Sequence, residues 1–101
     1  MICEIVEMTV DPARRDEYVE VYRKAWKEAG FAGSHGGKVL CSMDDPSKVM
    51  VLIEWDSLDA HRQHTRPRPG TPAHVHFREL IHPYMTETSK VGHYELADLT
   101  I

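Results

Sequence analysis

The alternation of apolar and polar positions along the chain predicts four β-strands. Residues 2–10 and 48–56 carry apolar side chains on both faces, a pattern typical of strands that are covered on both sides. Residues 38–43 form a shorter apolar segment after several glycines, and residues 91–99 alternate near the end of the chain. The segment 44–47, Asp-Asp-Pro-Ser, predicts a turn at hairpin spacing between the second and third strands.

Helical spacing of apolar residues fills the first long gap between these strands. Asp11 and Pro12 are suited to the N-cap and the first helical position, and Gly30 is typical of a helix C-cap. Between them, apolar residues spaced by three and four predict one helix. Its expected buried positions are Tyr18, Val21, Tyr22, Ala25, Trp26 and Ala29.

The second helical region is interrupted. Residues 57–64 begin with an N-cap serine and predict a short helix, which residues 67–70, Pro-Arg-Pro-Gly, bring to an end. A further helix is expected over residues 72–81. At helical spacing its buried stripe consists of Ala73, Phe77, Leu80 and Ile81. His74 and His76 are expected on opposite margins of this stripe.

The order of elements is β-α-β-β-α-β with the second helix interrupted. This is the ferredoxin-like split βαβ arrangement of an α+β protein, with a four-stranded antiparallel sheet. A chain of 101 residues is expected to form a single domain, residues 1–101. Helices would cover one sheet face, and the two-sided apolar strands require a cover for the other face as well. For so short a chain, the simplest partner to cover this face is a second copy of the same chain, so we expect a homodimer.

Composition narrows the possible partners. The chain has 42% hydrophobic and 28% charged residues, which is typical of a soluble globular protein, and a net charge of -4. An acidic balance disfavours nucleic acid, because phosphate binding needs a basic face. The apolar run Val49–Ile53 is far shorter than the ~20 residues of a membrane helix, and no signal peptide is recognisable, so we expect a cytoplasmic protein without a membrane partner. Cys3 and Cys41 lack metal or redox spacing and are expected as free thiols.

The segment Val49–Phe77 contains four of the seven histidines of the chain. Its run VMVLIEWDSLDAHRQH resembles the signature of the antibiotic-biosynthesis monooxygenase family. The matching positions are Glu54, Trp55, Ser57, Ala60, His61 and His64, followed downstream by His76 and Phe77. The resemblance implies a dimeric α+β barrel. Residues 66–71 form an insert where the family usually has a shorter link.

A second resemblance, to the stress-responsive α/β-barrel group that includes olivetolic acid cyclase, concerns the run Pro-Ala-His-Val-His-Phe at residues 72–77. It implies a general acid/base role for His74 and a pocket position for Tyr22, while Arg68 stands where that group has the tyrosine that pairs with the histidine. Haem-degrading members of the superfamily resemble this chain at Trp55 only.

These patterns lead to one functional expectation and its alternatives. We expect a cofactor-independent monooxygenase that acts on an electron-rich aromatic or polyketide-like substrate, with neither a cofactor nor a metal ion. The expected catalytic residues are His74, Tyr22 and His64, and the expected substrate-binding residues are Trp55, Phe77, Ile81, His61 and His76. A polyketide-type cyclase or isomerase would use the same acid/base pocket. A non-catalytic binding or stress-response module is the third possibility.

Overall fold

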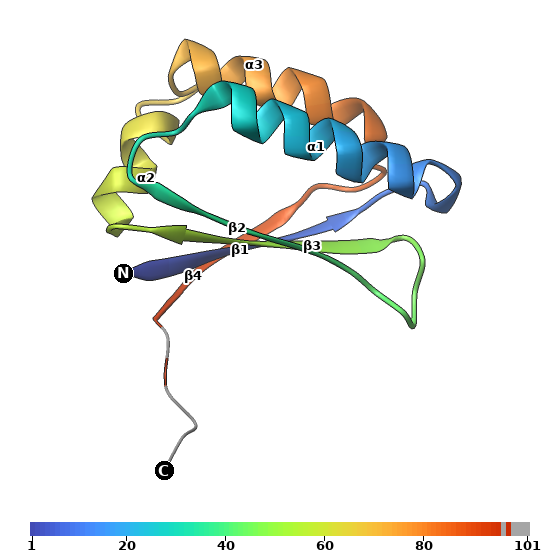
Figure 1. Ribbon diagram of the computed structural model, residues 1–101. Helices are drawn as coiled ribbons and strands as arrows, with labels where there is room; N and C mark the ends of the chain where they lie inside the picture. Colours follow the sequence, from blue (N-terminus) through green and yellow to red (C-terminus); the bar gives the residue numbers. More distant parts are fainter. Residues whose placement is uncertain (96, 98–101) are drawn as a thin grey trace.

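The computed structural model describes residues 1–95 and 97. Its four strands form one antiparallel sheet in the order β2-β3-β1-β4. The helices lie over one face of this sheet (Figure 1). The elements are β1 (Ile2–Thr9), η1 (Pro12–Arg14), α1 (Arg15–Ala29), β2 (Ser34–Cys41), β3 (Lys48–Trp55), α2 (Leu58–Thr65), α3 (Pro72–Ile81), η2 (His82–Tyr84) and β4 (Lys90–Glu95). The predicted ferredoxin-like order with an interrupted second helix is confirmed.

Local capping explains where the helices begin and end. The Asp11 side chain accepts a hydrogen bond from the backbone N–H of Ala13, and η1 leads directly into α1. Gly30 ends α1 with a φ of 56°, the left-handed conformation that glycine adopts at little cost. Ser57 and Thr71 cap α2 and α3 in the same way as Asp11 caps η1, since each hydroxyl accepts from a backbone N–H three residues later.

The second strand begins earlier than the apolar pattern predicts. It starts at Ser34 rather than Lys38 and ends at Cys41. A Cβ placed on Gly37 would lie 1.9 Å from the Leu52 carbonyl oxygen, so the glycine allows the backbones of β2 and β3 to approach closely. The register shifts between Ser34 and Gly37, as a β-bulge requires. Gly36 and Gly37, which precede the predicted strand, are therefore part of β2.

The other predicted boundaries hold to within a residue or two, with one exception. The described part of β4 covers Lys90–Glu95 of the predicted segment 91–99, and residue 97 is not in a strand. Residues 96, 98 and 99 of that prediction lie outside the described residues.

The core lies between the helices and the inner face of the sheet. Trp55, Tyr18 and Val10 are the largest side chains that are fully buried. On α3, Phe77 and Ile81 are buried as predicted, but Ala73 is exposed. Leu80 is partly buried against the core, so the rest of the apolar stripe faces inward. His74, Phe77, Arg78 and Ile81 line the inner pocket, so His74 lies on the side of α3 that borders this pocket.

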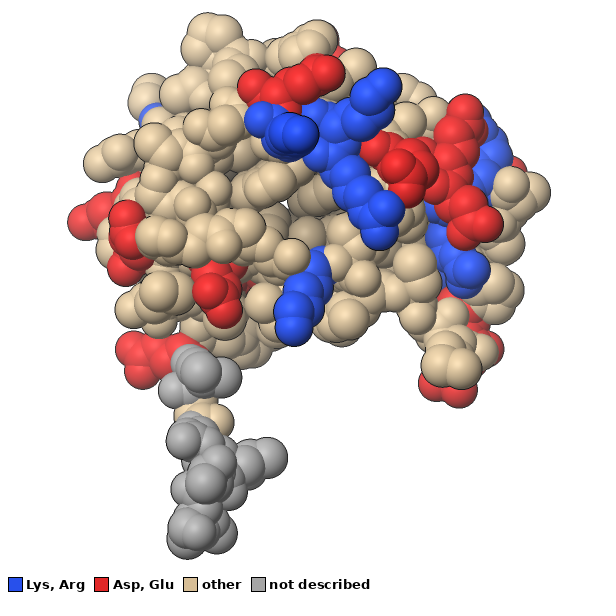
Figure 2. All heavy atoms as spheres, viewed as in Figure 1, with Lys and Arg blue, Asp and Glu red and all other residues tan. Residues whose placement is uncertain are grey.

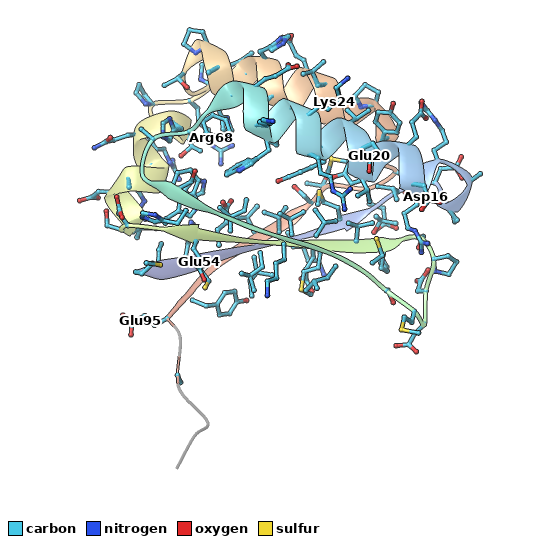
Figure 3. The ribbon with its side chains drawn as sticks, in the orientation of Figure 1. Asp16, Glu20, Lys24, Glu54, Arg68 and Glu95 are labelled. Atoms are coloured by element: carbon cyan, nitrogen blue, oxygen red, sulfur yellow. The ribbon has the colours of Figure 1, made fainter. Side chains whose placement is uncertain are left out.

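The helices leave the second face of the sheet uncovered (Figure 1), and this face carries a group of apolar side chains among charged ones such as Glu7 and Lys38. Strand register places Ile5 opposite Leu52 on this face, next to Met50 and Leu40. The exposed fractions are 47% for Leu40 and 55% for Tyr94, which lies at the β4 end of the same face. Glu54 also points to this side of the sheet (Figure 3). None of the helices that the structure describes is long and apolar enough to cross a membrane.

Candidate functional site

Two connected hollows lie between the sheet and the α2–α3 side of the helix layer. The outer cleft has a volume of about 930 Å³ and is lined largely by polar side chains. The inner chamber has a volume of about 140 Å³ and is lined largely by aromatic and aliphatic side chains. The two hollows share eight lining residues, which therefore mark the boundary between them: Glu4, His61, His74, Arg78, His82, Met85, Ser89 and Val91.

Aromatic rings form the inner chamber. The ring of Tyr22 meets that of Phe77 edge to face, with centroids 5.2 Å apart, and Trp26 meets Phe31 in the same manner at 5.1 Å. Trp55 on β3 is 1% exposed and completes the wall. Edge-to-face pairs of this kind stabilise a rigid apolar surface. The chamber is therefore suited to a flat, apolar ring rather than to a flexible polar chain.

His74 lies on α3 between the chamber and the cleft. Its Nδ1 is buried and has no hydrogen-bond partner among the described residues. Burial, and then the positive charge of Arg78, lower the pKa of His74 to about 4. The imidazole is therefore neutral at neutral pH and able to accept a proton. A negative charge that develops beside the imidazole would raise the pKa of His74 and favour proton transfer to it.

A chain of polar contacts runs from the chamber towards the β4 edge. Glu4 is 6% exposed and accepts a hydrogen bond from Trp55 Nε1 at 3.0 Å. The second oxygen of Glu4, Oε2, lies 3.3 Å from His61 Nε2, and His61 Nδ1 lies 2.8 Å from Nε2 of the exposed His93. The Trp55 ring stacks on the His61 ring at 4.7 Å. The arrangement connects a buried carboxyl group to the surface through two imidazoles.

Burial controls the charges in this chain. It raises the pKa of Glu4, against the effect of the Trp55 hydrogen bond, and lowers the pKa of His61 to about 4. His93 has a lowered pKa for the same reason. Because His61 is neutral near pH 7, its contact with Glu4 is not an ion pair. If Nε2 donates its hydrogen towards Glu4, Nδ1 accepts from His93.

Protein stability is expected to fall as the pH decreases from 6.5 towards 4. Unfolded histidines take up a proton near pH 6.5, whereas His61 and His74 do so only near pH 4, so acid favours the unfolded state in this interval. The lowered pKa of His61 accounts for at most about 3 kcal/mol of this loss in the free energy of unfolding. The raised pKa of Glu4 acts in the opposite direction and offsets part of the loss. Urea unfolding at several pH values measures the effect, and an unchanged midpoint would contradict these shifts.

Tyr22 on α1 is one of the residues that line the chamber. Burial strongly raises its pKa, and the nearby Tyr18 and Glu4 raise it further. The side chain therefore stays a neutral phenol, which can donate a hydrogen bond to a forming oxyanion. Tyr18, one turn earlier on α1, donates its own hydroxyl to the sulfur of Met8.

Two residues expected at the site line neither hollow, although the His64 ring lies behind the chamber wall, 5.0 Å from that of Phe31 and 5.7 Å from that of Trp55. His64 is half-buried, and its Nε2 is 2.8 Å from the Ala32 carbonyl oxygen, so it ties α2 to the segment after α1. His76 is exposed, because two residues along a helix turn the side chain about 200° away from His74. Neither lines the cleft or the chamber. Trp55, Phe77, Ile81 and His61 do line the chamber.

Sequence reasoning did not identify Glu4, His93 and Arg78 as site residues. Glu4 follows the same alternation as the inward-facing Val6 and Met8, and a single carboxyl group in that phase of an apolar strand was a usable signal. Arg78 lies one turn after His74 on α3. The sequence does not predict that His93 lies next to His61, because that position depends on the pairing of β4 with β1.

The comparison with known proteins identifies the family. The sequence profile of the antibiotic biosynthesis monooxygenase family matches residues 1–80. The chain belongs to this family. YczJ of Bacillus subtilis strain 168, an uncharacterised protein, is 22% identical to it over 96 residues, which are 94% of this chain and 98% of YczJ.

Solved structures of family proteins share the fold. A family protein from Bordetella bronchiseptica superposes with a TM-score of 0.81 at 22% identity, over 95% of this chain and 96% of the other. SnoaB, a cofactor-independent oxygenase from Streptomyces nogalater, superposes with a TM-score of 0.76 at 17% identity, over 98% of this chain and 95% of SnoaB. At these identities the similarity shows the fold, and the chemistry of this family member must be argued from its own side chains.

Proposed function

We propose that this family member is a cofactor-independent monooxygenase whose substrate is an electron-rich aromatic compound, and that His74 removes a proton from it. The observation that carries the proposal is the position of a neutral, half-buried imidazole at the mouth of an aromatic chamber. Membership of a monooxygenase family supports it, and so does the fold shared with an oxygenase described as cofactor-independent.

Each wall of the chamber has a part in the proposed reaction. The aromatic ring of the substrate lies against Trp55 and Phe77, and the carbon to be oxidised faces His74. Proton transfer to His74 leaves a carbanion that is delocalised onto a ring oxygen as an enolate. Tyr22 donates a hydrogen bond to that oxygen in a largely apolar chamber, where such a bond is stronger than in water. The substrate anion in turn favours the protonated form of His74.

The substrate itself supplies the electrons. The carbanion transfers one electron to O₂, the two radicals join in a C–O bond, and the peroxide loses water to leave a carbonyl group. For an activated CH₂ group the sum is one CH₂ and one O₂ giving one C=O and one H₂O. All four electrons come from the substrate, so no external reductant takes part.

The proposal predicts oxygen consumption by the protein alone. Phenols and aryl ketones with an activated CH₂ group are the candidate substrates, and an oxygen electrode follows uptake without added flavin, nicotinamide or metal. Uptake above the protein-free rate, matched by product carbonyl, is expected. If uptake stays at the protein-free rate while the protein still catalyses exchange of the CH₂ protons with deuterated water, the cyclase or isomerase alternative replaces the oxygenase.

We also propose that two copies of the chain pair through the open sheet face. The apolar side chains Ile5, Leu40, Met50 and Leu52 favour burial against a second copy of the same face. Sedimentation velocity at micromolar concentration is expected to show twice the 11.6 kDa of one chain. A boundary at the mass of a single chain would contradict the pairing without affecting the proposed chemistry.

A further inference from the structure

We propose that the outer cleft binds an acidic group of the substrate, a carboxylate or a phosphate, through Arg62, Arg66, Arg68 and Arg78. The inference rests on the proposed function, since the acidic group belongs to the molecule whose ring occupies the inner chamber. It specifies the substrate class as an aromatic acid or an aromatic phosphate.

The charge of the cleft differs from that of the whole chain. The chain has a net charge of -4, yet four arginines and only two carboxyl groups, Glu4 and Glu87, line the cleft. Elsewhere the charges are mixed, and Figure 2 shows acidic and basic side chains lying next to one another. On α1, for example, Arg23 pairs with Glu20 at 2.7 Å. A positive cleft on an acidic protein is suited to concentrating an anion.

Arg78 has unused hydrogen-bonding capacity at the boundary between the cleft and the chamber. One terminal N–H donates to the Pro69 carbonyl oxygen, while Nε is buried without a partner among the described residues. A partly desolvated guanidinium group with an unmet donor is costly, and an anion is the ligand that relieves this cost best. The charge of Arg78 also contributes to the lowered pKa of His74, so its field extends to the proposed base.

The insert between α2 and α3 supplies the other part of the cluster. Arg68 lies in this link, at the end of the helix layer (Figure 3), and Arg66 begins it. The link is held in place, because the N–H of Thr71 donates to the His64 carbonyl at 2.9 Å and that of Gly70 donates to the Pro67 carbonyl at 2.9 Å. Both arginines are therefore presented on an ordered segment.

Glycine is required at position 70 of the link. Gly70 has a φ of 100°, and a Cβ there would lie 2.7 Å from the His64 carbonyl oxygen. The backbone of the link is therefore fixed at the position where it approaches α2.

The two hollows together define the shape of the ligand. A ring system in the 140 Å³ chamber would point a substituent past His74 and Arg78 into the 930 Å³ cleft. Carboxylates and phosphates both match the planar, two-pronged donor geometry of arginine. Arg62, Arg66 and Arg68 are exposed, so their contribution is electrostatic and is expected to weaken as salt is added.

Calorimetric titration with three matched naphthalenes tests the inference. 2-Naphthoate and 2-naphthyl phosphate carry the two acidic groups on the ring, and 2-naphthol is neutral. We expect at least one of the two anions to bind about tenfold or more tightly than the naphthol, with the tighter one identifying the acidic group. The double substitution Arg66→Gln/Arg68→Gln is expected to remove most of this preference. Arg23→Gln, on the outer surface of α1, is the matched control and should leave it unchanged.

The possible outcomes separate this inference from the proposed function. Equal affinity for all three compounds, or an anion preference that survives the double substitution, overturns the acidic-group site but leaves the aromatic chamber intact. Absence of binding by any of the three, in protein with an unchanged circular dichroism spectrum, overturns both. An anion preference that also disappears in Arg23→Gln reflects overall charge and contradicts the cluster.

Discussion

Replacing His74 with alanine is expected to lower kcat/KM for oxygen-dependent turnover by about 10²–10⁴-fold, the usual contribution of a positioned general base. The His74 imidazole is neutral at neutral pH and, unlike that of His61, is not engaged by Glu4 and His93, and alanine cannot accept the proton. The measurement is oxygen uptake at several substrate concentrations, with the candidate substrate that gives the highest rate in the parent protein.

His76→Ala is the matched control for this substitution. It removes the same side chain from the same helix, but from the exposed face, and should leave the activity within about twofold of the parent rate. Comparable losses in the two variants would show that α3 was disturbed rather than that a base was removed. In the parent protein, activity is expected to decline only as the pH approaches the His74 pKa of about 4, since the base is neutral above it.

Tyr22→Phe is expected to lower kcat by about 10²–10³-fold, as removal of an oxyanion donor does in other enzymes. The ring stays in place against Phe77, so the chamber keeps its shape and KM should change little. The loss arises because the enolate forms only during the reaction, and a bond made only then lowers the barrier without strengthening substrate binding.

Tyr18→Phe provides the comparison. Tyr18 is on the same face of α1 and is also buried, but its hydroxyl group is bonded to Met8 rather than facing the chamber. Its removal should cost stability of about 1 kcal/mol and leave kcat unchanged. A loss of activity in Tyr18→Phe as large as that in Tyr22→Phe would remove the case for Tyr22 as the donor. A raised KM with unchanged kcat in Tyr22→Phe would assign it to ordinary substrate binding.

The buried pair of Glu4 and His61, which continues to the exposed His93, is costly for a domain of this size. Glu4 and His61 are 6% and 7% exposed, and their burial is tolerated because each meets a polar partner. An aliphatic residue at position 4 would be expected to give a more stable core, because the other inward positions of β1 are apolar. The presence of a carboxyl group there is consistent with a chamber that handles protons.

The sequence alone was sufficient for the architecture of this protein. The N-cap side chains at Asp11, Ser57 and Thr71 and the glycine at position 30 act within a few residues of themselves, so local pattern located the helices. The two-sided apolar pattern likewise located β3, and the short motif at residues 72–77 drew attention to His74 before its surroundings were known.

Tertiary structure decided what a local pattern does not contain. Glu4, His61 and His93 meet because β1, α2 and β4 are brought together by the order of strands in the sheet. The exposure of Ala73 and the position of His74 and Arg78 beside a pocket are features that hydrophobic periodicity cannot detect. The sequence does not show that the arginines of the cleft lie together, because they come from two helices and the link between them. Helix capping and strand alternation depend on residues that are close in the sequence, whereas a site depends on distances between residues that are far apart in the chain.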